Sequence, residues 1–131
     1  MIDRSRGTAD AVVARRRAER DSLIAVARGW AGRAGPALGA QAMVLVGSVA
    51  RGDFNKWSDI DVVVVAENLP ERLGDRLALL GPTHRPPGVE AILWTPAELA
   101  ERCARGTDPI AIEAYEVGVV LHGSLPRGAA S

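Results

Sequence analysis

The chain has 131 residues, of which 47% are hydrophobic and 24% charged, and its formal net charge at pH 7 is zero. The length is that of one domain, and the composition is that of a folded globular protein rather than a disordered one. A net charge of zero argues against general nucleic-acid binding through phosphate neutralisation. Because there is neither a membrane-spanning apolar run nor a signal-peptide core, we expect a cytoplasmic protein.

Few side chains could bind a soft metal ion. Cys103 is the single cysteine, which excludes an internal disulfide, and His84 and His122 are the only histidines. A metal site in this chain would therefore use carboxylate oxygens, which favours a hard cation such as Mg²⁺ or Mn²⁺.

Residues 9–34 are rich in Ala, Arg, Glu and Leu with apolar residues at helical spacing, which predicts a long amphipathic N-terminal helix. We expect Gly35-Pro36 to end it. The cluster Arg15-Arg16-Arg17 could be a basic patch for a partner, although a solvated helix face is the simpler interpretation.

Two apolar strands follow, at 41–46 and 59–66. Both consist largely of buried residue types on each face, so we expect a central position in a covered sheet. Gly47-Ser48 ends the first strand, and Ser48 suits the N-cap of a short helical turn reaching Arg51. Residues 52–58 form a polar loop, in which Phe54 and Trp57 could stack on a base or cover the core.

The second half of the chain alternates helices and strands. Leu69, Leu73, Leu77 and Leu80 form one stripe, which predicts a helix over 69–80. Thr95-Pro96-Ala97-Glu98 has the residues of a capping box, and Thr107-Asp108-Pro109 is a second helix start. The remaining predicted elements are a loop at 81–88, a strand at 89–94, helices from 96 to 105 and from 109 to about 116, and a strand at 119–122. The pattern is that of an α/β or α+β protein.

Three carboxylates mark a candidate metal site. Asp59 and Asp61 stand at positions i and i+2 of an extended segment, so their side chains point to the same face. Glu90 begins the next strand and is a natural third ligand, which could also accept the proton of an attacking hydroxyl. Phosphoryl and nucleotidyl transfer use paired divalent ions held by carboxylates in this way.

The residues before Asp59 supply a candidate phosphate site. Gly47 lets the backbone approach a phosphate closely, and the following amides with the Ser48 hydroxyl could hold phosphate oxygens. Arg51, Lys56 and Ser58 complete the predicted nucleotide-binding set.

The pattern Gly-Ser, ten residues, Asp-x-Asp, followed by a strand with a third carboxylate, resembles the DNA polymerase β-type nucleotidyltransferases. The ending DPIAIEAYEVGVVLHGS also resembles the last helix and strand of the minimal nucleotidyltransferases of that superfamily. The resemblance implies one nucleotidyltransferase domain over 1–131, with a mixed sheet flanked by helices. Its expected parts are an N-terminal helix at 9–34, a catalytic core at 41–94, C-terminal helices and a last strand at 95–123, and a flexible tail at 124–131.

The resemblance also implies a reaction. Asp59, Asp61 and Glu90 match the metal-binding carboxylates, Gly47 and Ser48 match the phosphate-holding pair, and the cofactors would be Mg²⁺ or Mn²⁺ with ATP as AMP donor. Many minimal nucleotidyltransferases are antitoxins that add AMP to a tyrosine of a HEPN-type toxin, so such a protein is the expected partner. A non-catalytic, nucleotide-binding antitoxin and transfer to a small molecule such as an aminoglycoside remain alternatives. The sequence leaves a homo-oligomer open.

Overall fold

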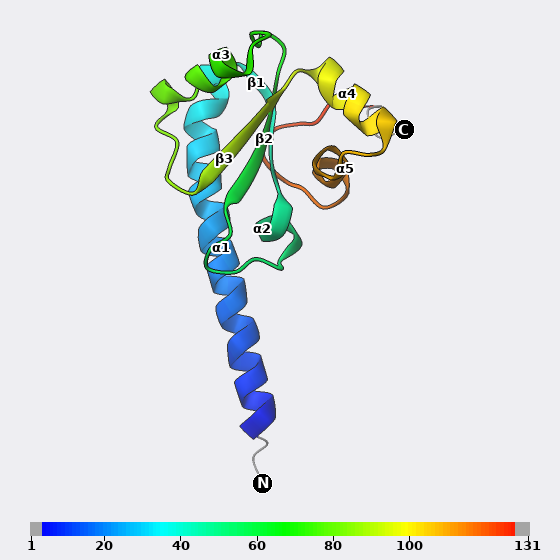
Figure 1. The fold of residues 1–131 in the computed structure, drawn as a ribbon. Coiled ribbons are helices and arrows are strands. Elements are labelled where there is room, and N and C mark those ends of the chain that lie inside the picture. The colour runs from blue at the N-terminus through cyan, green and yellow to red at the C-terminus, as the bar shows by residue number, and fades with distance from the viewer. Residues whose placement is uncertain (1–3, 128–131) are drawn as a thin grey trace.

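The computed structural model describes residues 4–127 and has helices packed on both faces of a four-stranded sheet (Figure 1). The sheet order is β3-β2-β1-β4. β1 runs antiparallel to β2 and β4, whereas β2 and β3 are parallel, so the sheet is mixed as the resemblance implies. The strands are β1 (Ala40–Val46), β2 (Ile60–Ala66), β3 (Val89–Trp94) and β4 (Val119–Gly123). The helices are α1 (Arg4–Leu38), α2 (Gly47–Arg51), α3 (Leu73–Ala78), the 3₁₀ turn η1 (Gly81–Thr83), α4 (Pro96–Arg105) and α5 (Pro109–Glu116).

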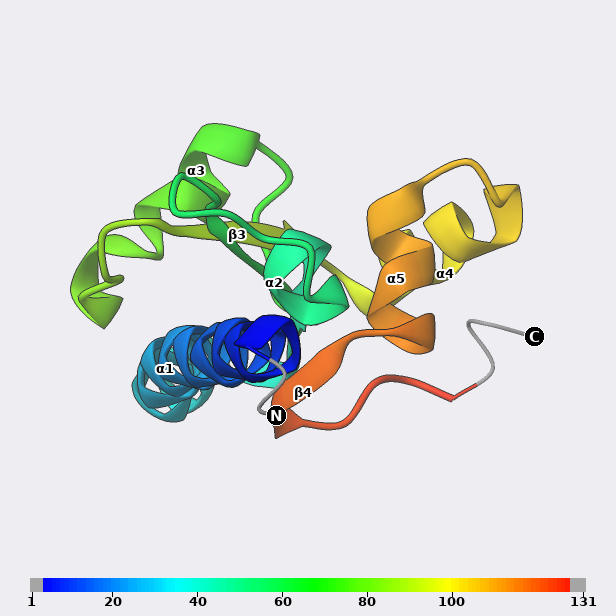
Figure 2. The same cartoon turned by 90° about the horizontal axis from the view of Figure 1, so that it is seen from below.

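Side-chain alternation in the two central strands divides the core in two. One face of the sheet packs on α1, and the other packs on α4 and α5, as the view from below shows (Figure 2). In β2, Val62 and Val64 belong to the first cluster, and Val63 and Val65 belong to the second. Because both faces are covered, β1 and β2 are apolar on both sides, which confirms the central position predicted for them.

The long N-terminal helix is longer than predicted and only half of it is amphipathic. Among residues 7–38 of α1, the buried residues all lie in the second half of the helix, at Ala27, Trp30, Ala31, Ala34 and Gly35. The first half projects beyond the sheet, and Val12 and Val13 are exposed there (Figure 1). No helix within residues 4–127 is long and apolar enough to cross a membrane.

The prediction that Gly35-Pro36 ends this helix is wrong. Pro36 lies inside the last turn of α1, and the chain leaves the helix only at Gly39, whose φ is 62°. A proline near a helix end removes one hydrogen bond and leaves the preceding turns intact. Gly35 has a different role, because an added Cβ would lie 2.7 Å from the His122 ring. Its lack of a side chain lets α1 approach β4.

Two further local predictions differ from the structure. The helix expected over 69–80 is reduced to α3, where Leu73 and Leu77 are exposed. Pro70 disfavours helical backbone at the residue before it, so Leu69 lies outside the helix. Ser48 is not an N-cap, because the N-cap of α2 is Val46 and no side chain caps that end.

The C-terminal helices have the predicted bounds. Thr95 and Glu98 form the reciprocal capping box of α4, and Gly106 ends that helix with a φ of 68°. Asp108 caps α5. Of the expected flexible tail, Ser124–Arg127 are described and in contact with the body: the Ser124 amide donates to Gln41 and the Tyr115 hydroxyl donates to Pro126. Residues 128–131 lie outside the described part.

Candidate functional site

The carboxylates predicted as metal ligands lie at the end of the sheet where β2 and β3 begin. Asp61 and Glu90 are register partners in the parallel pair β2–β3, so their Cα atoms are about 4.8 Å apart. Val46, the last residue of β1, is the partner of Asp61 on the other side. Gly47, the next residue after Val46, therefore lies directly beside Asp61. Asp59 precedes β2, and its side chain is exposed. Residues far apart in the sequence meet at one corner of the α4–α5 face.

Gly47 is in contact with Asp61. Its φ is 75°, and a Cβ built on it would lie 2.6 Å from Asp61 Oδ2. Left-handed backbone already favours glycine, and here a side chain would also displace the carboxylate. The glycine that the sequence assigns to phosphate approach is thus also required for the position of Asp61.

The charges around Asp61 are predominantly negative. Burial raises the pKa of the Asp61 carboxyl, and the neighbouring charges of Asp59, Glu90 and Glu113 raise it further, while Arg51 opposes them. Carboxylates this close repel one another unless a cation neutralises them. The donor set, which is made only of carboxylate oxygens, fits a hard divalent cation.

The carboxylates do not form a ready-made cage. Within residues 4–127, no three His, Cys, Asp or Glu side chains are close enough to hold a metal ion as they stand. Asp59 and Glu90 are exposed, so their side chains are free to rotate towards Asp61. A cation at this corner would therefore be bound through side-chain rotation on a fixed backbone.

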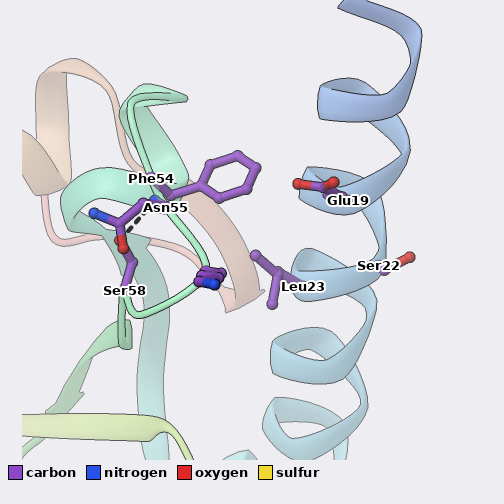
Figure 3. A pocket seen from close by; sticks show the side chains of 7 residues that line it. Glu19, Ser22, Leu23, Phe54, Asn55 and Ser58 are labelled. Carbon is purple, nitrogen blue, oxygen red and sulfur yellow. Dashed lines mark hydrogen bonds between the residues drawn. The ribbon is translucent and has the colours of Figure 1, made fainter. Parts of the chain in front are cut away.

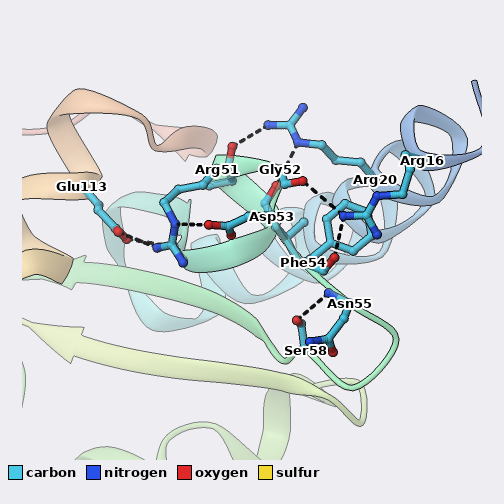
Figure 4. Close-up of polar contacts among 12 residues, drawn as sticks. Arg16, Arg20, Arg51, Gly52, Asp53, Phe54, Asn55, Ser58 and Glu113 are labelled. Carbon is cyan, nitrogen blue, oxygen red and sulfur yellow. Dashed lines mark hydrogen bonds and ion pairs between the residues drawn. The ribbon is translucent and has the colours of Figure 1, made fainter. Parts of the chain in front are cut away.

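Glu113 of α5 is a residue at this site that the sequence did not single out. Its Oε2 accepts the Gly47 amide at 3.1 Å, and its Oε1 pairs with Arg51 Nη1 at 2.5 Å. Arg51 also contacts Asp53, at 3.2 Å (Figure 4). In this conformation the Glu113 carboxylate contacts the Gly47 amide and the Arg51 guanidinium, which are the two groups predicted from the sequence to bind phosphate. Glu113 lies 66 residues from Gly47, and no local pattern signals its approach.

Ser48, Lys56 and Ser58 have different positions relative to this corner. Ser48 follows Gly47 in α2 and is half-buried. Lys56 and Ser58 instead line a cavity of about 320 Å³ between α1 and the 52–58 loop (Figure 3). Leu23, which packs against the core cluster beneath α1, also lines this cavity. Lys56 and Ser58 therefore line a cavity beside α1, although Ser58 directly precedes Asp59 in the chain.

The two loop aromatics have unlike surroundings. Phe54 is buried in the α1 cluster with the Arg16 guanidinium 4.2 Å from its ring centroid, so it covers the core. Trp57 is 81% exposed, with Lys56 Nζ 5.0 Å from its ring. The cluster Arg15-Arg16-Arg17 is likewise divided, because Arg16 contacts the loop while Arg15 and Arg17 are exposed.

Comparison with known proteins agrees with this geometry. The sequence profile of the nucleotidyltransferase domain family matches residues 37–111, which include β1, α2, β2 and β3, and the chain belongs to that family. A candidate nucleotidyltransferase from Sulfolobus solfataricus, known from its crystal structure, has a similar fold. The TM-score is 0.59 at 20% identity, over 80% of this chain and 84% of that chain. No curated protein sequence has significant similarity to this one.

Proposed function

We propose that this nucleotidyltransferase-domain protein transfers AMP from ATP to a hydroxyl group of a partner protein. The observation that carries the proposal is the juxtaposition of Gly47, Asp61 and Glu90 by strand register. It combines a backbone able to approach phosphate with acidic side chains that need a cation.

Each residue has a part in the proposed reaction. Asp59 and Asp61 would hold the divalent ions, which when bound would neutralise the triphosphate and activate the attacking oxygen. Gly47 and Ser48 hold phosphate oxygens, and Arg51 leaves Glu113 to contact them. Glu90, which is exposed at the start of β3, accepts the proton of the acceptor hydroxyl.

The bond changes balance without a further reactant. The acceptor oxygen forms a bond to the α-phosphorus of ATP, and the bond from that phosphorus to the bridging oxygen breaks. Pyrophosphate leaves with the electron pair of that bond. The residues of this chain orient the two oxygens in line and remove the proton.

We further propose a tyrosine of a HEPN-type toxin as the acceptor, with this chain as its antitoxin. The exposure of Asp59 and Glu90 supports a macromolecular acceptor, because both carboxylates are open to solvent at the end of the sheet where β2 and β3 begin. A tyrosine hydroxyl on a partner's surface could reach this end of the sheet.

The direct experiment uses α-³²P-labelled ATP, Mg²⁺ and, as the proposed acceptor, the protein encoded by the neighbouring reading frame. Label is expected on the partner with wild-type protein, and not with the Asp59→Asn, Asp61→Asn double variant. A partner that lacks the acceptor tyrosine is the matched control and should remain unlabelled. Absence of transfer with wild type, or equal transfer with the double variant, contradicts the enzymatic proposal.

One observation favours a second candidate, a non-catalytic antitoxin that binds nucleotide. As they stand, the acidic side chains of residues 4–127 form no metal cage. For this candidate the double aspartate variant would still bind the partner and suppress its toxicity. If the protein is an enzyme, the double aspartate variant should lose both the labelling of the partner and the suppression of its toxicity.

A further inference from the structure

Two arginines of the N-terminal helix bind the segment that carries the proposed phosphate site. Arg20 donates from Nε to Val49 O and from Nη2 to Ala50 O, both at 2.8 Å. Arg16 donates from Nη2 to Phe54 O at 2.6 Å and to Gly52 O at 3.3 Å. The two side chains are one helical turn apart on the same face of α1 (Figure 4).

The acceptors are carbonyl groups that helix geometry leaves without partners. The last carbonyls of an α-helix have no intrahelical donor, and Val49 and Ala50 belong to the final turn of α2. Arg20 supplies two donors to them from a planar fork, which a lysine cannot reproduce. Arg20 thus caps α2 from outside, while Arg16 holds the first residues of the following loop.

The other anchors of this segment are the contacts of Gly47 and Arg51 with Glu113 and a small number of buried side chains. α2 has five residues, too few to be stable on their own, and only Val49 and Ala50 are buried in it. In the next seven residues only Phe54 is buried, and Arg16 covers its ring. Neither arginine forms an ion pair within the described residues, so their hydrogen-bonding capacity is directed at this backbone.

We propose that Arg16 and Arg20 are positioning residues for nucleotide binding. They hold α2, and with it Ser48 and Arg51, against the sheet corner that contains Asp61. The inference rests on the proposed function, since it assigns these arginines to the same site. It also gives the N-terminal helix a part in the reaction, although neither arginine touches the nucleotide.

Loss of these arginines should affect nucleotide binding but not metal binding. Asp61 and Glu90 are fixed by strand pairing, which the arginines do not contact. Ser48 and Arg51 belong to the segment that the arginines hold. Loss of Arg20 should therefore weaken binding of a non-hydrolysable ATP analogue with Mn²⁺ about tenfold, while binding of Mn²⁺ alone is unchanged.

The experiment compares Arg20→Ala and Arg16→Ala with Arg17→Ala by calorimetry, at a temperature where all are folded. Arg17 is exposed on the same helix and is the matched control, expected to bind as wild type does. Arg20→Lys should be intermediate, because one ammonium cannot serve both carbonyls in fork geometry. If Arg20→Ala does not fold, the comparison of Arg20→Lys with wild type carries the test.

A double-variant cycle tests whether Arg20 acts on nucleotide binding through Arg51. If it does, the losses of binding free energy in Arg20→Ala and Arg51→Ala should be strongly non-additive. A fall in Tm with analogue affinity unchanged would show a purely structural role and overturn the inference. Equal weakening by Arg17→Ala would overturn it as well. Failure of wild type to bind the analogue with Mn²⁺ would instead count against the proposed function.

Discussion

Replacing Gly47 by alanine should have two effects: it should strain the left-handed backbone, and it should displace the Asp61 carboxylate. Comparison with Gly52→Ala distinguishes them. Gly47 and Gly52 flank the body of α2, with φ values of 75° and 90°. An added Cβ at Gly47 would lie 2.6 Å from Asp61 Oδ2, whereas at Gly52 it would meet nothing within 4 Å. The two variants therefore share the backbone penalty and differ in the displacement of one carboxylate.

The magnitudes follow from these two contacts. A left-handed non-glycine residue costs roughly 1–2 kcal/mol, so both variants should unfold about 3–8 °C lower than wild type. The Asp61 carboxylate can rotate away from the new methyl group, so the additional loss of stability at Gly47 should be small. That rotation removes a ligand, and Mn²⁺ affinity should fall by about 10- to 100-fold in Gly47→Ala only.

Two measurements are needed for each variant. Circular dichroism during heating gives the unfolding temperature, and calorimetric titration gives the Mn²⁺ affinity. Gly52→Ala calibrates the backbone strain, because its Cβ points into open space. Equal Mn²⁺ affinity in Gly47→Ala and Gly52→Ala would refute the reasoning, since Asp61 would then bind no metal or would not be displaced.

Three further predictions concern separate parts of the site and fold. Glu113→Gln should tighten binding of the ATP analogue by about 3- to 10-fold in calorimetry, because a neutral amide competes less for the Gly47 amide; weaker binding would contradict this. Because neighbours and burial raise the pKa of Asp61, its contribution to stability is fully present below the unfolded-state pKa and is lost as pH rises through the folded one. Asp61→Asn should thus be more stable than wild type at pH 7 in EDTA, and urea titrations should show that gain shrinking towards pH 4; a gain independent of pH would refute it. Gly35→Ala should lower stability by about 1–3 kcal/mol through its clash with the His122 ring, whereas the exposed helical Gly32→Ala should raise it by about 0.5–1 kcal/mol; thermal melts that rank the two alike would show that α1 can shift.

Local signals in the sequence were sufficient for the elements with strong caps. The bounds of α4 and α5 follow from Thr95 with Glu98 and from Asp108 before Pro109, because these side chains act within one helical turn. The apolar run that follows Asp59 and Asp61 likewise predicted β2, which begins at Ile60 with Asp61 as its second residue and Asp59 directly before it. Such features depend on neighbours in the chain and are readable without a structure.

Tertiary contacts decided the rest. The pairing of Asp61 with Glu90 depends on which strands adjoin, and the approach of Glu113 depends on how α5 packs on the sheet. The course of α1 beyond Pro36 depends on a last turn that still packs against β4. Lys56 and Ser58 follow the phosphate motif in sequence, yet both line the cavity between α1 and the 52–58 loop. Spacing alone could not predict that divergence.

The most direct test of the central claim is calorimetric titration of the wild-type protein with a non-hydrolysable ATP analogue, with and without Mn²⁺. A nucleotide site formed by Gly47 and the carboxylates predicts binding that requires Mn²⁺ and is lost in the Asp59→Asn, Asp61→Asn variant while the fold persists. Metal-independent binding, or equal affinity in the double variant, would contradict the claim that this corner of the sheet is a metal-dependent nucleotide site.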